Sequence, residues 1–164
     1  LQDIHYFNGT IVLVISMFDN NLRYCREELE LTQEQLGKFF EVSDASIRAW
    51  ENANSSIPLS KLAKFCSEYN YSLDFVCGLT RKNTHYGPFK INRALISKNL
   101  KKFRKSRNIS QQVLSDECKL PQTTYSGYET GKYLITTTNL YYLCKTYNIS
   151  MDYIVNRTNN MFCK

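Results

Sequence analysis

The sequence lacks the residue patterns of several functional classes. It has only two histidines, and none of its six cysteines forms a Cys-x-x-Cys pair, so a zinc site has no support. It also has no glycine-rich phosphate loop and no grouping of a nucleophile with a histidine, which argues against an enzyme. We therefore expect no catalytic residues, no metal and no cofactor.

Long hydrophobic runs are also missing. The apolar run at residues 11–15 is far too short to span a bilayer, so we expect no membrane partner. The first residues carry Asp3 and no basic stretch, from which we expect no secretory leader. The even number of cysteines would suit disulfides in a secreted chain, but without a leader we expect reduced, buried thiols in a cytoplasmic protein.

Positive charge is what the sequence has in excess. Its 164 residues carry 21 Lys and Arg against 15 Asp and Glu, which gives a net charge of +6 and a pI of about 9.0. Hydrophobic residues make up 43%, which is typical of a globular chain rather than a disordered one. A basic globular chain suits a polyanionic partner, although charge alone does not identify that partner.

An internal repeat organises the chain. A shift of 78 positions places residues 21–80 on residues 99–158 without a gap, and fourteen positions are identical. The identical pairs include Arg26 and Arg104, Gln33 and Gln111, Glu51 and Glu129, Cys66 and Cys144, and Asp74 and Asp152. So many matches in an ungapped overlap predict a duplicated unit.

Each repeat has the pattern of about five short helices. In the first repeat, Thr32 and Gln35 predict a capping box, and Ser43 predicts the N-cap of the third helix. In the second repeat, Ser110 stands at the start of the second helix, and Gly131 stands where the third helix should end in a left-handed residue. The sequence therefore predicts an all-α fold built from two tandem five-helix domains.

The predicted domains lie at residues 17–80 and 97–160, with a linker at 81–96 that has an irregular pattern. About 16 free linker residues would span roughly 50 Å at full extension. That reach exceeds the separation of neighbouring half-sites on DNA, about 34–36 Å. Both domains could therefore reach adjacent major grooves, as a covalent mimic of a dimer.

Residues 1–16 precede the repeats and have the pattern of a short β-hairpin. Strand-like runs at 3–7 and 10–15 flank an Asn-Gly pair, which is a strong hairpin signal. An isolated hairpin is marginally stable in water, so it would pack on another surface, such as a partner's hairpin in a homodimer. The alternative is that translation starts at Met17 and that these residues are an incidental extension.

Short stretches of both repeats resemble one known family. In the first repeat they are LTQEQL at 31–36, VSDASI at 42–47, WEN at 50–52 and SLDFV at 72–76. In the second repeat they are ISQQVL at 109–114, Tyr125, YETGK at 128–132 and SMDYI at 150–154. The chain resembles, in both repeats, the lambda-repressor-like, Cro/Xre-type helix-turn-helix family of DNA-binding domains.

The resemblance implies that the third helix of each repeat enters the major groove of double-stranded DNA. The base-reading positions would hold Asp44, Ala45, Ser46 and Arg48 in the first repeat and Gln122, Thr123, Thr124 and Ser126 in the second. Ser43, just before the third helix, is a further candidate for DNA contact. The glutamine that begins each second helix, Gln33 or Gln111, would contact phosphate. Further candidates for DNA contact are the basic residues Lys101, Lys102, Arg104 and Lys132.

Charge separates the two repeats. The first has six basic and nine acidic residues, whereas the second has nine basic and four acidic residues. Phosphate attraction supplies most non-specific affinity for DNA, so the second repeat is better suited to bind it. Asp44 would repel phosphates, whereas Gln122 can pair with adenine and the methyl of Thr123 can pack on a thymine methyl. The basic run at 101–107 either contacts phosphate or is only a solvated helix face.

The leading hypothesis is a sequence-specific transcriptional regulator, a repressor, that binds double-stranded DNA through the third helix of each repeat. The alternative is an antitoxin-like or oligomerising interaction protein, in which the first domain binds protein and only the second binds DNA. The acidic first repeat favours part of the alternative.

Overall fold

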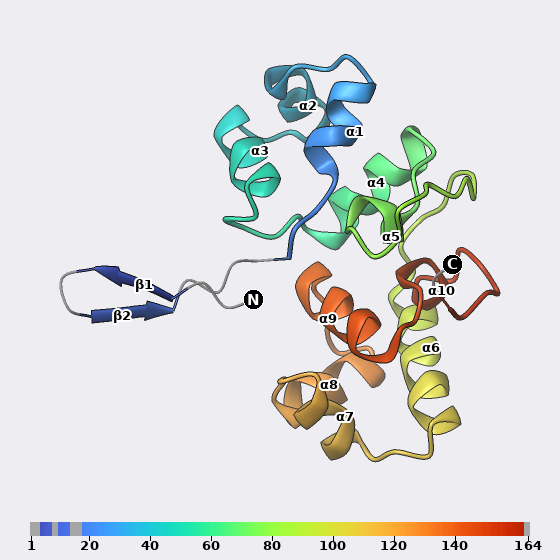
Figure 1. The fold of residues 1–164 in the computed structure, drawn as a ribbon. Coiled ribbons are helices and arrows are strands. Elements are labelled where there is room, and N and C mark those ends of the chain that lie inside the picture. The colour runs from blue at the N-terminus through green and yellow to red at the C-terminus, as the bar shows by residue number, and fades with distance from the viewer. Residues whose placement is uncertain (1–3, 8–9, 14–17, 163–164) are drawn as a thin grey trace. The chain divides into compact units, whose positions relative to one another are not determined.

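The computed structural model describes residues 4–7, 10–13 and 18–162, and in these the fold is helical apart from two short strands (Figure 1). The helices of the first repeat are α1 (Leu22–Glu28), α2 (Gln33–Phe40), α3 (Asp44–Glu51), α4 (Leu59–Glu68) and α5 (Leu73–Val76). Those of the second are α6 (Arg93–Ser106), α7 (Gln111–Glu117), α8 (Gln122–Glu129), α9 (Thr137–Tyr147) and α10 (Met151–Ile154).

The predicted fold of two five-helix repeats is confirmed. Helices α3 and α8, and likewise α5 and α10, have bounds that differ by the same 78 residues as the sequence repeat. Left-handed backbone recurs with the same offset, at Glu30 and Asn108, Glu41 and Lys119, Ala53 and Gly131, Asn70 and Asn148, and Gly78 and Asn156. Positive φ is uncommon outside glycine, so its recurrence at matched loop positions shows that the turns as well as the helices are duplicated.

Strands β1 (Ile4–Phe7) and β2 (Thr10–Leu13) pair antiparallel, with Ile4 opposite Leu13 and Phe7 opposite Thr10. The two predicted strands therefore exist, each shorter than its apolar run. The Asn-Gly turn predicted between them lies outside the described residues.

The chain divides into two compact units, Leu1–Ser56 and Ile57–Lys164. The first unit holds α1, α2 and α3, whose apolar faces bury Leu22, Leu36 and Ile47 completely. The capping box of Thr32 and Gln35 is present as predicted, because each side chain bonds the backbone N–H of the other residue.

The second unit holds α4 to α10, and its boundary falls inside the first repeat, between α3 and α4. Leu100 and Phe103 of α6 and Leu114 of α7 are fully buried, as is Tyr125 of α8. These side chains come from helices that pack on one another, so α8 is supported by α6 on one side and α7 on the other.

Helices α5 and α10 join the end of the first repeat to the end of the second. The Asp74 backbone N–H donates to the Asp152 carboxylate over 3.1 Å, and the Met151 N–H donates to the Asp74 carboxyl over 2.6 Å. Each aspartate thus bonds the first turn of the opposite helix, where exposed N–H groups favour an acceptor. The contact is reciprocal because Asp74 and Asp152 are equivalent positions of the repeat.

The linker is not the free tether that the sequence suggested. The Phe89 N–H donates to the Ser67 hydroxyl over 2.8 Å, the Gly87 N–H donates to the Asn70 side chain, and Arg157 donates to the Gly87 carbonyl over 2.7 Å. Helix α6 also begins at Arg93, inside the predicted linker of 81–96. The expectation of a 50 Å reach through a flexible chain is therefore wrong, since residues 83–89 are bonded to α4 and its flanking turns.

Five cysteines are buried free thiols: Cys25, Cys66, Cys77, Cys118 and Cys144. Within residues 18–162 and the two strands, no group of His, Cys, Asp and Glu could hold a metal ion. None of the helices described above is long and apolar enough to cross a membrane.

Candidate nucleic-acid interface

The turn between α7 and α8 is set by three local features. The Ser110 hydroxyl caps α7 by accepting the Val113 N–H, as predicted for this residue. Lys119 then takes a left-handed conformation with φ of 54°, which redirects the chain after α7. Pro121 is extended and precedes α8, where its fixed φ and missing N–H cost nothing. The result is a helix, a tight turn and a second helix.

Helix α8 is anchored by its buried side and exposes its opposite side. Tyr125 is completely buried, and its hydroxyl lies 3.5 Å from the Leu100 carbonyl of α6. Thr123 is exposed, and Gln122, Thr124 and Ser126 are half-buried. The predicted base-reading residues of the second repeat therefore lie on the accessible side of α8. The buried Tyr125 ring fixes the rotation of the helix about its axis.

A buried carboxylate ties α6, α7 and α8 together. Glu129, whose side chain is 2% exposed, accepts bonds of 2.6 and 2.9 Å from the Arg104 guanidinium. The Gln111 amide donates to the same carboxylate over 2.8 Å, and Arg104 also donates to the Ile109 carbonyl. Because Arg104 binds Glu129 through two nitrogens and Gln111 binds the same carboxylate, this network holds α6, α7 and α8 rigidly together at the start of α7.

The protonation of Glu129 follows from this network. Burial opposes ionisation of its carboxyl, but hydrogen bonds from Arg104, Gln111 and Tyr125 outweigh burial, so the pKa of Glu129 is lowered. The carboxylate is therefore ionised at neutral pH and holds the Gln111 amide with its nitrogen inward and its oxygen outward.

The outward oxygen of Gln111 meets the first residue of α8. The Gln122 side-chain nitrogen donates to it over 3.0 Å. The chain of bonds from Glu129 through Gln111 to Gln122 fixes which way the Gln122 amide faces. Its oxygen and second N–H make no bond within residues 18–162, which leaves an acceptor and a donor side by side at the exposed start of α8.

The basic candidates separate into two kinds. Lys101 and Lys102 are exposed on α6, whereas the Arg104 side chain is only 14% exposed and is committed to Glu129. We therefore place Arg104 in the structural network and keep Lys101 and Lys102 as the candidates for phosphate contact. Lys101 lies one helical turn before Arg104, on the same face of α6.

The first repeat builds the same joint at its own α3. The Arg26 guanidinium pairs with Glu51, and the Gln33 amide donates to Glu51 over 2.8 Å. The position equivalent to Gln122 holds Asp44, and its carboxylate pairs with Arg48 over 2.8 Å, one turn along α3. The two charges at the predicted reading positions of α3 are therefore paired with each other.

The remaining candidates of the first repeat serve partly as caps. The Ser43 hydroxyl accepts the Ser46 N–H over 3.3 Å and lies 3.1 Å from the Ser46 hydroxyl. Ala45 is exposed and offers only a methyl group. The scaffold of the two repeats is thus the same, and what differs is the chemistry at the exposed start of α3 and of α8.

Comparison with known families decides what these repeats are. A family model described as helix-turn-helix matches residues 22–76 and again residues 100–154. The chain belongs to the helix-turn-helix family. The two matches together cover more than half of the chain, and each contains one helix-turn-helix pair, α2 with α3 or α7 with α8. No curated protein and no solved structure matches the chain.

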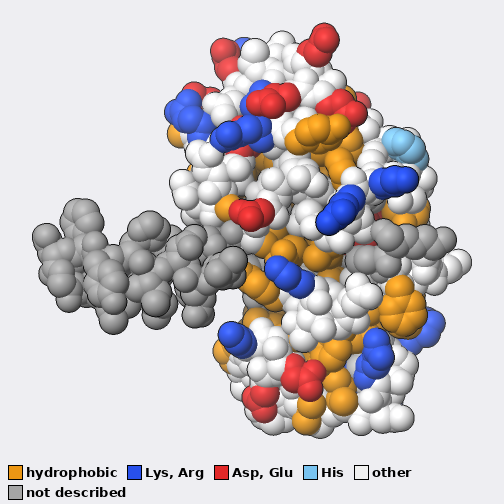
Figure 2. Space-filling view, viewed as in Figure 1, with side chains coloured by type: hydrophobic (Ala, Val, Ile, Leu, Met, Phe, Trp, Pro, Cys, Tyr) orange, Lys and Arg blue, Asp and Glu red, His pale blue; other side chains and the backbone are white. Residues whose placement is uncertain are grey.

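The helix-turn-helix family is one of DNA-binding transcription regulators, so the chain is a DNA-binding regulator with two tandem copies of the domain. The surface of the first copy is mixed in charge, and Figure 2 shows acidic side chains among the basic ones over α1 to α3. This mixture agrees with the excess of acidic residues counted in the first repeat.

One exposed residue of the second helix-turn-helix copy was missed by the sequence analysis. Tyr133 lies four residues after the end of α8 and is 51% exposed, and Lys132 lies over its ring at 5.2 Å from the ring centroid. The ring covers Gly127, where an added Cβ would lie 2.6 Å from a ring carbon. The first repeat has Ala49 in place of Gly127 and Ser55 in place of Tyr133. The joint replacement of these two residues between the repeats is the sequence feature that could have pointed to Tyr133.

Proposed function

We propose that the chain is a sequence-specific repressor of transcription that reads double-stranded DNA mainly through α8. In this proposal α8 lies in the major groove, with Gln122 and Thr123 against base edges and Thr124, Ser126 and Lys132 beside them. Lys101 and Lys102 contact the phosphates beside α8, while Gln111, whose outward atom is an acceptor, orients Gln122 instead of contacting phosphate. Repression requires only that the protein occupy its site, for which a DNA-binding domain suffices.

The single observation that carries the proposal is the fixed amide of Gln122. An adenine presents an acceptor and a donor side by side in the major groove, and a glutamine amide can satisfy both. An unsupported glutamine must be ordered on binding, which costs side-chain entropy. The bond of 3.0 Å to Gln111, itself held by Glu129, provides that order before DNA arrives.

Gln122→Ala tests the proposal in a binding selection on random duplexes. The substitution should weaken binding to the preferred site by about 1–3 kcal/mol and relax the preference at one base pair. Gln112→Ala is the matched control, because Gln112 is an exposed glutamine of α7 that bonds Asp116 instead. If the two variants select the same sequences as the unaltered chain, Gln122 does not read bases.

A second candidate function is favoured by one feature of α3. The Asp44–Arg48 ion pair stands at the predicted reading positions, and the first repeat carries more acidic than basic residues. An acidic surface meets unfavourable Coulomb energy near phosphates. In this alternative the first repeat binds a protein, as in antitoxin-like assemblies, and only the second binds DNA.

The two candidates separate in a chain whose second repeat is disabled. The triple variant Lys101→Glu, Lys102→Glu and Gln122→Ala changes exposed or half-exposed side chains and leaves the Arg104–Glu129 joint intact. Sequence-selective DNA binding that survives in this variant would show that the first repeat reads DNA. Loss of all selective binding would show that the first repeat does not read DNA on its own, as the alternative requires.

A further inference from the structure

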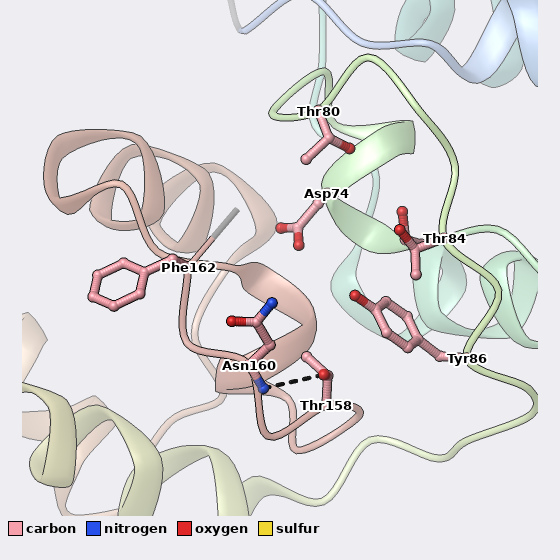
Figure 3. A pocket seen from close by; sticks show the side chains of 8 residues that line it. Asp74, Thr80, Thr84, Tyr86, Thr158, Asn160 and Phe162 are labelled. Atoms are coloured by element: carbon pink, nitrogen blue, oxygen red, sulfur yellow. Dashed lines mark hydrogen bonds between the residues drawn. The ribbon is translucent and has the colours of Figure 1, made fainter. Parts of the chain in front are cut away.

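A polar cavity lies where the end of the first repeat meets the end of the second. Its volume is about 190 Å³, and its lining residues come from the segment that begins at the N-cap of α5 and from the segment after α10 (Figure 3). Cavities of about 150 Å³ are large enough to hold benzene, so this one has room for a molecule of about six heavy atoms. The side chains that matter below are Asp74, Thr80, Thr84, Tyr86, Thr158 and Asn160.

Asp74 gives the cavity its charge. Its carboxyl lies at the cavity wall and is turned toward the start of α10 rather than toward Thr84, and none of the described residues that line the cavity is Lys, Arg or His (Figure 3). The bonds to this carboxyl come from the Ser150 hydroxyl and the Met151 N–H, which are neutral donors. A buried carboxylate without a cationic partner is unfavourable, and a cation in the cavity would stabilise it.

The nearby arginine does not supply that cation. Arg157 pairs with Asp152 over 3.3 Å. Its guanidinium also donates to the carbonyls of Tyr71 and Gly87 over 2.6 and 2.7 Å. The residue of the first repeat equivalent to Arg157 is Leu79. Asp152 therefore has an arginine partner from its own repeat, whereas Asp74 does not. Burial and the neighbouring Asp152 accordingly raise the pKa of Asp74 to about 7.

The rest of the lining is rich in hydroxyl groups. Thr80, Thr84, Tyr86 and Thr158 each carry one, and the Asn160 side chain adds an amide (Figure 3). Hydroxyls can donate or accept, so they suit a second polar group of a ligand. The Tyr86 ring is already covered by the Arg157 guanidinium, 5.6 Å from the ring centroid, so Tyr86 contributes its hydroxyl rather than its ring face. An anion would meet Asp74 and is disfavoured.

We propose that this cavity is a binding site for a small organic cation, a primary amine that also carries a hydroxyl group. The ammonium group pairs with Asp74, and the ligand hydroxyl bonds the threonine and tyrosine hydroxyls. Because the lining comes from both repeats, the bound cation holds the α5 and α10 segments together. The proposal is independent of which repeat reads DNA.

Isothermal titration calorimetry of the full chain with 4-amino-1-butanol tests the site, and 1,4-butanediol serves as its uncharged isostere. The amine should bind and the diol should not. At neutral pH the measured heat should change with the ionisation enthalpy of the buffer, because the ammonium group displaces a proton from Asp74. Equal binding of both compounds, or binding of neither, overturns the proposal.

Asp74→Asn should abolish amine binding, whereas Asp116→Asn, which alters an exposed carboxylate on α7, should leave it unchanged. If Asp74→Asn fails to fold, Thr84→Val and Tyr86→Phe provide the decision, since each removes one lining hydroxyl. Each should weaken amine binding several-fold while the helical circular dichroism stays the same. Unaltered binding in a folded Asp74→Asn chain, or in both hydroxyl variants, would rule the site out.

Discussion

Single residues decide how the two repeats differ, because their scaffolds are alike. Gln122 and Asp44 occupy equivalent positions, 78 residues apart, on helices with matching bounds. Gln122 is held by a neighbouring amide, whereas Asp44 is paired within its own helix to Arg48. The same backbone therefore presents a hydrogen-bonding amide in one repeat and an ion pair in the other.

Asp44→Ala should leave DNA affinity unchanged or raise it, with little change in sequence preference. Removing the carboxylate takes away a repulsion and leaves Arg48 able to approach phosphate. The measurement is a fluorescence-anisotropy titration of duplex DNA with each variant. Glu34→Ala is the matched control, because Glu34 forms the same kind of pair with Lys38 on α2. If Asp44→Ala abolishes sequence preference, the ranking of the repeats is reversed.

At the scale of the element, α8 shows how packing shapes the exposed surface. Gly127 leaves room for the Tyr133 ring, and the first repeat fills the equivalent positions with Ala49 and Ser55. Alanine is more favourable than glycine inside a helix by about 0.5–1 kcal/mol. Gly127 therefore lowers the stability of α8, and what it provides in return is space for the Tyr133 ring. Tyr133 lies beside Lys132, and we predict that it contributes to DNA binding.

A double-mutant cycle tests this pair. Gly127→Ala should lower DNA affinity while leaving the melting temperature unchanged or slightly raised, because the added methyl displaces the ring but favours the helix. Tyr133→Ser should lower affinity as well. Once Tyr133 is replaced, Gly127→Ala should have no further effect, which anisotropy titrations of all four chains would show. Additive losses would mean that Gly127 acts through the helix backbone rather than through the ring.

The contact between α5 and α10 predicts an unusual dependence of stability on pH. The folded chain holds the Asp74 proton to about pH 7, whereas an unfolded aspartate releases it near its ordinary pKa of 3.8. Stabilisation from this group is therefore complete below that ordinary value and is lost as pH rises through about 7. The groups around Asp74 are Asp152, whose pKa burial also raises, the Ser150 hydroxyl and Tyr86.

The melting temperature should accordingly be higher at about pH 5 than at about pH 8, and Asp74→Asn should reduce that difference. Glu129 has a lowered pKa and would destabilise the fold only below its ordinary value of 4.5, outside this range. Thermal melts followed by circular dichroism at the two pH values give the answer. If the difference in melting temperature between the two pH values is unchanged in Asp74→Asn, a titratable group other than Asp74 causes it.

At the scale of the whole molecule, charge is distributed unevenly along the chain. The second repeat has nine basic and four acidic residues, and residues 81–98 add five basic residues and no acidic ones. Counterion release by lysines and arginines makes affinity for duplex DNA fall steeply as salt rises. The net charge of +6 therefore predicts salt-sensitive binding whichever base pairs are read.

The variant with Lys101→Glu and Lys102→Glu should weaken binding to every DNA sequence by a similar factor and reduce the salt dependence. Both lysines are exposed, so the fold should be retained, in contrast to a change at Arg104 that would leave Glu129 unpaired. Affinities for preferred and random duplexes across a salt series provide the measurement. Lys61→Glu and Lys64→Glu on α4 form a control with the same change in charge. An equal loss in both variants would mean that only net charge matters.

The sequence by itself determined the helical class, the duplication and the caps, because these depend on local hydrogen bonds and on apolar spacing. Thr32, Ser43 and Ser110 cap the helices for which they were predicted, and Gly131 has the positive φ expected of it. The resemblance to helix-turn-helix domains was also carried by short stretches of sequence, which the family match confirmed.

Only the tertiary structure decided which polar side chains are engaged by others. Arg104 had the sequence context of a phosphate contact, but its partner Glu129 lies 25 residues away, and the two meet only when α6 packs on α8. Asp74 and Asp152 were visible as a repeated pair, yet nothing local placed each at the start of the other's helix. Long-range pairing depends on how helices pack, and helical spacing in the sequence records which face is buried but not what lies against it.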